Sequence, residues 1–143
     1  MTLRTPVRGA AAGLALALAL FLSAAASGDQ APVQSKKKPA LLLRANPTIA
    51  FAPAKVQFQA ILEGGDDNYE EYYCAAIEWE WDDDTVSEST PDCEPYEAER
   101  SHITRRYSSV HVFREDGRYE VKFKLKRKDD VLALTSISIQ IGS

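Results

Sequence analysis

The sequence has few of the residues from which metal and redox sites are built. It contains only two cysteines and two histidines. Structural zinc needs four closely spaced cysteine or histidine ligands, and redox pairs are typically spaced as Cys-x-x-Cys, so neither kind of site is expected. His102 and His111 form no metal-ligand pattern, and no serine lies in a recognisable nucleophile motif. Carboxylates are abundant, but exposed loops do not supply the raised pKa that acid catalysis requires. We therefore expect a protein that is not an enzyme and has no cofactor. A hydrolase ranks third, behind the two functions given at the end of this subsection.

Long hydrophobic runs are also absent after the first few dozen residues. The single apolar run, Ala10 to Leu22, follows Arg4 and Arg8 and precedes the small residues that end at Ala26. This order predicts a signal peptide over residues 1–26 with cleavage after Ala26. The run is shorter than the roughly 20 residues that span a bilayer, and no cysteine follows it to carry a lipid. We therefore expect a secreted or periplasmic protein with no stable membrane anchor after cleavage.

Basic residues are missing from one long stretch of the chain. Residues 63–99 contain fifteen acids and no lysine or arginine, whereas residues 100–128 contain ten bases and three acids. Cleavage after Ala26 removes two arginines and no acid, so the net charge of −4 becomes −6. Nucleic acid is therefore not an expected partner. The asymmetry indicates an acidic surface that faces a basic partner or a cation, or charge pairing inside the protein.

Export changes the interpretation of the two cysteines. In an oxidising compartment an even number of cysteines indicates a disulfide, and Cys74 with Cys93 is the only pair within the chain. A bridge that closes a loop of about twenty residues stabilises a fold by about 3 kcal/mol in the chain-entropy model.

The dominant hydrophobic period after the signal segment is two, which is the period of a half-buried strand. We expect a polar linker over residues 27–45 and one domain over residues 46–143, a usual size for a small domain. No long amphipathic helix is evident. The segments with strand patterns are 48–51, 55–62, 75–81, 106–113, 117–126 and 131–141. Six or seven short strands with polar turns predict an all-β, antiparallel sandwich.

The last of these segments changes its alternation. Ile137, Ile139 and Ile141 share one parity, whereas Leu132 and Leu134 share the other. One extra residue reverses every later side chain, so the pattern predicts a β-bulge or a partly covered outer face near residue 133.

Two short segments resemble motifs of a known family. Residues 79–85 read Trp-Glu-Trp-Asp-Asp-Asp-Thr, and residues 111–121 read His-Val-Phe-Arg-Glu-Asp-Gly-Arg-Tyr-Glu-Val. Domains of the polycystic kidney disease (PKD) type carry Trp-x-Phe-Gly-Asp-Gly followed by His-x-Tyr-x-x-x-Gly-x-Tyr-x-Val. The residues that follow these patterns are Trp79, Trp81, Asp83, His111, Phe113, Gly117, Tyr119 and Val121. The resemblance implies an immunoglobulin-like β-sandwich and a role in protein or carbohydrate contact outside the cell.

The resemblance also assigns most of these residues to the core. We expect Trp79 at the centre of the sandwich, with Trp81 in the core but near enough to the strand end to reach a surface. His111 fits a buried or half-buried histidine that is hydrogen-bonded to backbone, and Gly117 fits a turn position with positive φ. Phe113, Tyr119 and Val121 complete the predicted scaffold.

The chain departs from the family pattern after the tryptophan strand. Asp82 and Asp84 stand where the motif has glycines, so we expect a reshaped turn. A long segment, residues 86–105, then separates this turn from the next strand and contains Cys93. The expected disulfide pins this segment to the start of the tryptophan strand, in contrast to the inter-sheet bridge of antibody domains.

Part of the acidic charge has an internal explanation. The tryptophan strand pairs with the tyrosine strand in an immunoglobulin-like sandwich, which would set Glu78 and Glu80 beside Lys122, Lys124 or Arg118. Cross-strand opposite charges contribute about 0.2–1 kcal/mol per pair.

The remaining carboxylates define a candidate binding surface. Its residues are Asp66, Asp67, Trp81, Asp82, Asp83 and Asp84. We expect it to bind an extracytoplasmic protein or a glycan, so that the protein is a non-catalytic interaction or spacing module. The alternative is a calcium-stabilised structural protein with Asp82 and Asp84 as ligands, although no EF-hand pattern is present.

Overall fold

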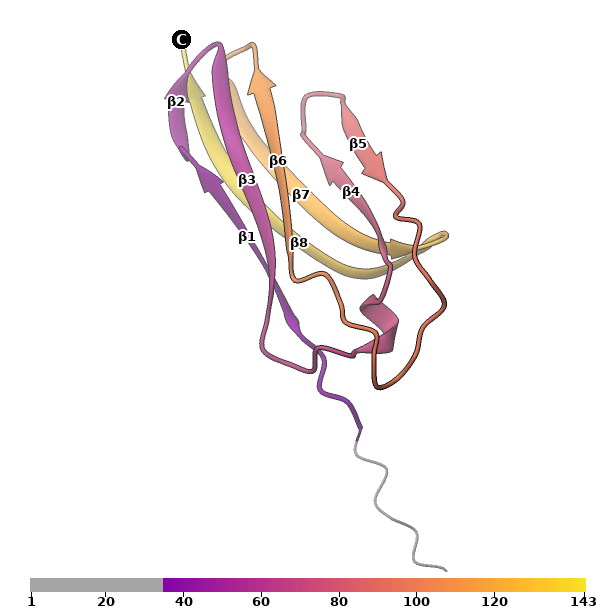
Figure 1. Ribbon diagram of the computed structural model, residues 1–143. Coiled ribbons are helices and arrows are strands. Elements are labelled where there is room, and N and C mark those ends of the chain that lie inside the picture. The colour runs from indigo at the N-terminus through magenta and orange to yellow at the C-terminus, as the bar shows by residue number, and fades with distance from the viewer. Residues whose placement is uncertain (1–34) are drawn as a thin grey trace, which may run out of the picture. The chain divides into compact units, whose positions relative to one another are not determined.

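The computed structural model describes residues 35–143, which form two packed β-sheets and one turn of 3-10 helix (Figure 1). The elements are β1 (Ala40–Asn46), β2 (Ile49–Phe51), β3 (Ala54–Glu63), η1 (Glu70–Tyr72), β4 (Ala76–Glu80), β5 (Val86–Ser89), β6 (Arg106–Phe113), β7 (Gly117–Arg127) and β8 (Asp130–Gly142). The predicted signal peptide, residues 1–26, lies outside the described residues. Within residues 35–143, no helix is long and apolar enough to cross a membrane.

The two sheets differ in width. One has three strands in the order β1-β3-β6, and the other has five in the order β2-β8-β7-β4-β5. All pairings are antiparallel except that of β2 with β8, which is parallel. The all-β sandwich class is therefore confirmed, with eight strands in place of six or seven.

The two additional strands are β1 and β5. β1 overlaps the segment that was predicted to be a linker, residues 27–45, so regular structure is present from Ala40 and not only from residue 46. The linker prediction was wrong here, since Leu41, Leu43 and Ala45 pack against the core. β5 lies at the start of residues 86–105 and is exposed throughout, so no hydrophobic alternation marked it.

The core is built from alternate residues of the facing strands. Val56, Phe58 and Ala60 of β3 are fully buried, as are Val121 and Phe123 of β7. Two indole rings extend this core, since Trp79 is 3% exposed and Trp81 is 1% exposed. Phe58 contacts both rings, with centroid distances of 6.3 Å and 5.3 Å.

The parity change in β8 comes from a bulge. Leu125 pairs with Ala133 and Lys126 pairs with Val131, so Leu132 has no partner in the β7 ladder. This is the irregularity that the sequence predicted near residue 133. It allows Leu132 to pack against the core although Ile139 and Ile141 are on the opposite parity.

A disulfide joins Cys74 to Cys93, as predicted. It ties the segment that follows β5 to the residues just before β4. The same segment also buries Ile103 and accepts a hydrogen bond from Asn68 Nδ2 to the Ala98 carbonyl at 2.8 Å. The long segment is thus held against the end of the sandwich where η1 lies.

The first described residues and the C-terminus lie at opposite ends of the sandwich (Figure 1). β1 enters the three-stranded sheet at the end where η1 lies. β8 leaves the five-stranded sheet at the other end, where the Ala52 N–H donates to the Gly142 carbonyl at 2.8 Å.

Candidate functional site

The turn between β4 and β5 holds Asp82, Asp83 and Asp84 together. Asp82 and Asp84 have φ angles of 65° and 63°, in the left-handed region that glycine enters without strain and that aspartate tolerates better than most residues. Both positions, at which the motif has glycine, therefore have a left-handed backbone. The expected reshaping of the turn stays a prediction.

Asp83 links this turn to the opposite sheet. Its Oδ2 lies 2.6 Å from Nε2 of His111 in β6, and its Oδ1 accepts hydrogen bonds from the backbone N–H and the hydroxyl of Thr85. Burial raises the pKa of Asp83, but the hydrogen bonds from His111 and Thr85 outweigh it and hold that pKa below its ordinary value. We had expected His111 to bond to backbone, and its partner is a carboxylate.

A stack of rings supports this pair. The His111 ring lies parallel to Trp81 at 4.3 Å between centroids, and Trp81 lies parallel to Trp79 at 5.3 Å. The indole N–H of Trp81 donates to Ser87 Oγ at 2.9 Å. Trp81 is therefore a core residue, and its inclusion in the candidate binding surface was wrong.

An open groove of about 710 Å³ lies beside the turn. Its charged lining is mostly acidic, since it has the four carboxylates of Asp82, Asp83, Asp84 and Glu115 and only two basic side chains, Arg114 and His111. The remaining lining residues are Thr85, Val112 and Tyr119. Asp82 also accepts the backbone N–H of Glu120 at 2.8 Å, which fixes the turn to β7. We call this groove the acidic groove.

Asp66 and Asp67 lie elsewhere. They follow the end of β3, whereas His111 beside the acidic groove pairs with Val56 near the start of the same strand. Asp66 exchanges hydrogen bonds with the backbone of Lys37, and Asp67 forms an ion pair with Arg105. The predicted surface is thus divided between the two ends of the sandwich, and its Asp66–Asp67 part is occupied by internal contacts.

Several site residues were missed from the sequence. Arg114, Glu115 and Val112 line the acidic groove, and no motif pointed to them. Arg105 donates to the Leu62, Gly64 and Gly65 carbonyls at 3.1, 2.7 and 3.3 Å, and only the fold brings these acceptors together. Thr85 could have been found, because an aspartate two residues before a threonine favours a local side-chain turn.

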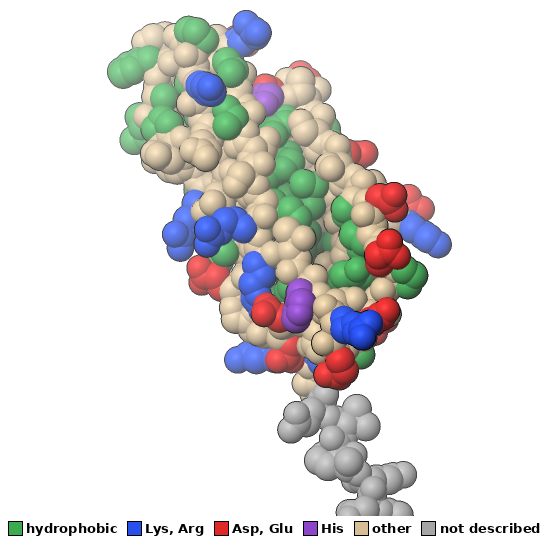
Figure 2. All heavy atoms as spheres, in the orientation of Figure 1, with side chains coloured by type: hydrophobic (Ala, Val, Ile, Leu, Met, Phe, Trp, Pro, Cys, Tyr) green, Lys and Arg blue, Asp and Glu red, His purple; other side chains and the backbone are tan. Residues whose placement is uncertain are grey.

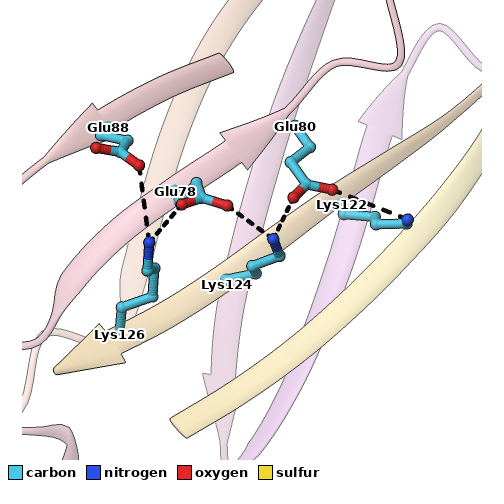
Figure 3. Close-up of polar contacts among 6 residues, drawn as sticks. All are labelled: Glu78, Glu80, Glu88, Lys122, Lys124 and Lys126. Atoms are coloured by element: carbon cyan, nitrogen blue, oxygen red, sulfur yellow. Dashed lines mark hydrogen bonds and ion pairs between the residues drawn. The ribbon is translucent and has the colours of Figure 1, made fainter. Parts of the chain in front are cut away.

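A second charged cluster covers the outer face of the five-stranded sheet (Figure 3). It consists of Glu78, Glu80, Glu88, Lys122, Lys124 and Lys126, and we call it the ion-pair ladder. The predicted pairing of the β4 glutamates with lysines of β7 is present, without Arg118. Lys124 Nζ lies 2.7 Å from Glu78 Oε1 and also contacts Glu80, and Lys126 Nζ lies 2.6 Å from Glu78 Oε2.

The ladder fixes the charge state of Glu78, Lys124 and Lys126. Hydrogen bonds from Lys124 and Lys126 lower the pKa of Glu78 from 4.5 to about 2, against the effect of burial. The same contacts raise the pKa of both lysines. These groups stay ionised at neutral pH, so Glu78 does not have the protonated form that a general acid needs.

The Asp83–His111 pair has a geometry that differs from a nucleophile-activating dyad. In such a dyad the histidine stands between the acid and the nucleophile, whereas here Asp83 stands between His111 and the Thr85 hydroxyl. Within residues 35–143, no group of three or more acidic, histidine or cysteine side chains could hold a metal ion.

A smaller cavity of about 210 Å³ lies beside the disulfide. Its apolar lining includes Ala75, Ile77, Pro91 and Tyr107, and we call it the apolar pocket. The remaining lining residues are Tyr73, Cys74, Ser89, Cys93, His102 and Thr104. It extends along the start of β6, as the acidic groove extends along its end.

No family model matches the chain, and no curated protein matches it in sequence. Among solved structures, the chain is similar to the PKD domain of an M14-like peptidase from Thermoplasmatales archaeon SCGC AB-540-F20. The match has a TM-score of 0.51 and 11% identity, and it covers 76% of this chain and 100% of that domain. At this identity the likeness concerns the fold, and it agrees with the PKD-like sandwich that the motifs predicted.

Proposed function

We propose that this protein is an exported, non-catalytic module that binds a protein or a glycan, or spaces other parts, at the cell exterior. The observation that carries the proposal is a PKD-like sandwich that contains a disulfide and has an open acidic groove at one end. The structurally similar domain is described as the PKD domain of an M14-like peptidase. Sandwich domains of this kind serve many functions, so the site must carry the assignment.

The disulfide supports export. Disulfides persist in oxidising compartments and are rare in the cytosol. The predicted signal peptide over residues 1–26 would deliver the chain to such a compartment. In the source cells, N-terminal sequencing should then give a mature chain that begins at Ser27. Thiol labelling should leave Cys74 and Cys93 unmodified, and an intracellular chain with both thiols free would overturn this proposal.

The side-chain geometry supports a non-catalytic role. Glu78 of the ladder is held ionised, and Asp83 of the Asp83–His111 pair is bonded to both His111 and Thr85. Neither arrangement supplies a poised acid or an activated nucleophile.

The acidic groove is the surface that we propose for partner contact. The test uses immobilised residues 27–143 to capture partners from an extracytoplasmic extract of the source cells, which is treated with protease in one sample and with periodate in another. The variant D84N/E115Q removes two of the four carboxylates that line the groove, and asparagine tolerates the left-handed backbone at residue 84. The control variant E63Q/E97Q removes the same charge elsewhere. Equal capture by all three proteins would exclude the groove as the contact surface.

Calcium binding is a separate proposal, favoured only by the carboxylates that line one groove. Calcium takes six to eight oxygen ligands, and here the Asp82 and Asp83 carboxylates already accept hydrogen bonds. If calcium binds, millimolar calcium raises the melting temperature of the wild type and not that of D82N/D84N. An unchanged wild-type melting curve would rule this proposal out.

A further inference from the structure

One edge of β6 has no strand partner among the described residues. The three-stranded sheet ends at β6, and the five-stranded sheet extends to β5. β5 and β6 are therefore the edge strands on the same side of the sandwich, because β4 and the start of β6 both line the apolar pocket. Figure 2 shows hydrophobic side chains in a hollow on the surface of the molecule.

The backbone of β6 has unpaired groups that face this side. The Leu62 N–H donates to the Arg105 carbonyl at 2.8 Å, which sets the phase of the ladder between β3 and β6. Hydrogen-bonded and non-hydrogen-bonded pairs alternate in an antiparallel ladder, so counting from Leu62 and Arg105 places Ser108 and Val110 in non-hydrogen-bonded pairs. Their N–H and C=O groups therefore point away from β3. Within residues 35–143, no backbone hydrogen bond outside the β3 ladder involves these groups.

Both cavities lie along this edge. Tyr107 lines the apolar pocket, and His111 lines the acidic groove. These two residues are four apart on the same face of β6, a separation of about 13 Å along a strand. An exposed strand edge offers main-chain hydrogen bonds, and pockets beside it select alternate side chains of an added strand.

We propose that an extended basic peptide adds to the free edge of β6 as an antiparallel strand. The inference rests on the proposed interaction function and names its mode and the chemistry of the partner. A lysine or arginine of the peptide enters the acidic groove, and an apolar side chain four residues later enters the apolar pocket. Charge complementarity selects the basic residue, because four carboxylates line the groove beside Arg114 and His111.

The test uses a capped nonapeptide of threonine with lysine at its second position and leucine at its sixth. Binding is followed by amide NMR of the full mature chain. We expect shifts and slowed hydrogen exchange at Ser108 and Val110. A control peptide of the same composition has lysine and leucine three residues apart, which places them on opposite faces of the strand. We expect this peptide, and a second control with glutamate in place of lysine, to bind at least about tenfold more weakly. N-methylation of the amides that face β6 should abolish binding.

A matched pair of protein variants tests the edge itself. Proline is accepted on an edge strand where the N–H faces solvent, so V110P keeps the fold and loses the donor. V110A keeps the donor and should bind the peptide like the wild type. If V110P fails to fold, N-methylation of the peptide tests the same hydrogen bonds on the wild type.

Three outcomes would overturn the proposal. They are peptide shifts confined to other faces, binding that survives N-methylation, and sedimentation that shows β6 occupied by a second copy of this chain. If partners are still captured through the acidic groove, these results reject strand addition and leave the proposed function standing. A chain retained inside the cell with reduced cysteines rejects the proposed function whatever the peptide does.

Discussion

At the scale of single residues, the turn after β4 places two aspartates in a backbone conformation that favours glycine. Asp82 and Asp84 hold left-handed φ angles that glycine would adopt freely. Asp82 has a compensating hydrogen bond to the Glu120 N–H, whereas Asp84 is exposed. Strain without compensation should therefore be concentrated at residue 84.

The first prediction concerns that strain. We expect D84G to raise the free energy of unfolding by up to about 1 kcal/mol and D84A to lower it by a similar amount, since alanine is disfavoured at positive φ. D82G is the control. Its free energy of unfolding should rise less, because it loses the hydrogen bond between the Asp82 carboxylate and the Glu120 N–H. Urea denaturation measures all three variants. A D84G protein less stable than D84A would show that the turn conformation is not what limits this position.

The second prediction concerns the Asp83–His111 pair. D83N keeps the shape of the side chain but loses its charge, and we expect a loss of about 1–3 kcal/mol at neutral pH. The pKa of Asp83 is lowered in the folded protein, so this contribution is complete above its ordinary value of 3.8 and is lost as the pH falls through the lowered pKa. Unfolding measured from neutral to acid pH should show the wild type and D83N converging. D92N, on the exposed segment, should follow the wild type throughout.

At the scale of elements, the ion-pair ladder connects β4, β5 and β7. Its central glutamate lies between two lysines on the neighbouring strand, and one of those lysines also contacts β5. A register slip by one residue would move all of these charges to the opposite face. The ladder therefore supports the register that also buries Trp79 and Phe123.

The third prediction follows from the charge on Glu78. Its folded pKa of about 2, against an ordinary 4.5, corresponds to at most about 3 kcal/mol of stability at neutral pH, less where solvent screens the lysines. The pKa is depressed by folding, so this stability is present above pH 4.5 and is lost as the pH falls toward 2. E78Q should flatten this acid dependence in chemical unfolding. E63Q, from an exposed pair with Arg44, should retain it.

The elements differ in how far the sequence could predict them. β3, β6, β7 and β8 bury one face each, so their alternation revealed them, including the bulge at Leu132. β5 buries nothing, and its place depends on pairing with β4. β1 was missed because three consecutive leucines, residues 41–43, obscure the alternation beside a polar stretch.

At the scale of the whole molecule, the disulfide holds residues 90–105, a long described segment without regular structure. Cys74 and Cys93 are separated by 19 residues in sequence. The segment between them includes β4, the acidic turn and β5. Reduction should therefore loosen both the edge strand and the groove.

The fourth prediction measures this constraint. We expect C74S/C93S to lower the free energy of unfolding by about 3 kcal/mol in the chain-entropy model. Urea denaturation with and without a reducing agent provides the comparison, since the reduced wild type should match the variant. Proteolysis at exposed Arg100 should also accelerate. Equal urea midpoints for the oxidised wild type and the variant would show that packing alone holds the segment.

The site was less predictable than the fold for a physical reason. Motifs marked Asp83 and His111, but their bond requires two sheets to be packed face to face. The groups that line the acidic groove come from the β4–β5 turn and the end of β6, which are some thirty residues apart in sequence. Asp66 and Asp67 resembled the other aspartates in sequence, and only tertiary structure shows that Lys37 and Arg105 occupy them.

The placement of the two chain ends has a mechanical consequence. When tension is applied between them, β1 and β8 are pulled along their own axes in opposite directions (Figure 1). Inter-strand hydrogen bonds lie across that direction, so the seven residue pairs between β1 and β3 are loaded in shear and must yield together. The disulfide lies off this line of force. A sandwich tethered at both ends would thus resist stretching through its outermost ladders while its acidic groove stays unstrained.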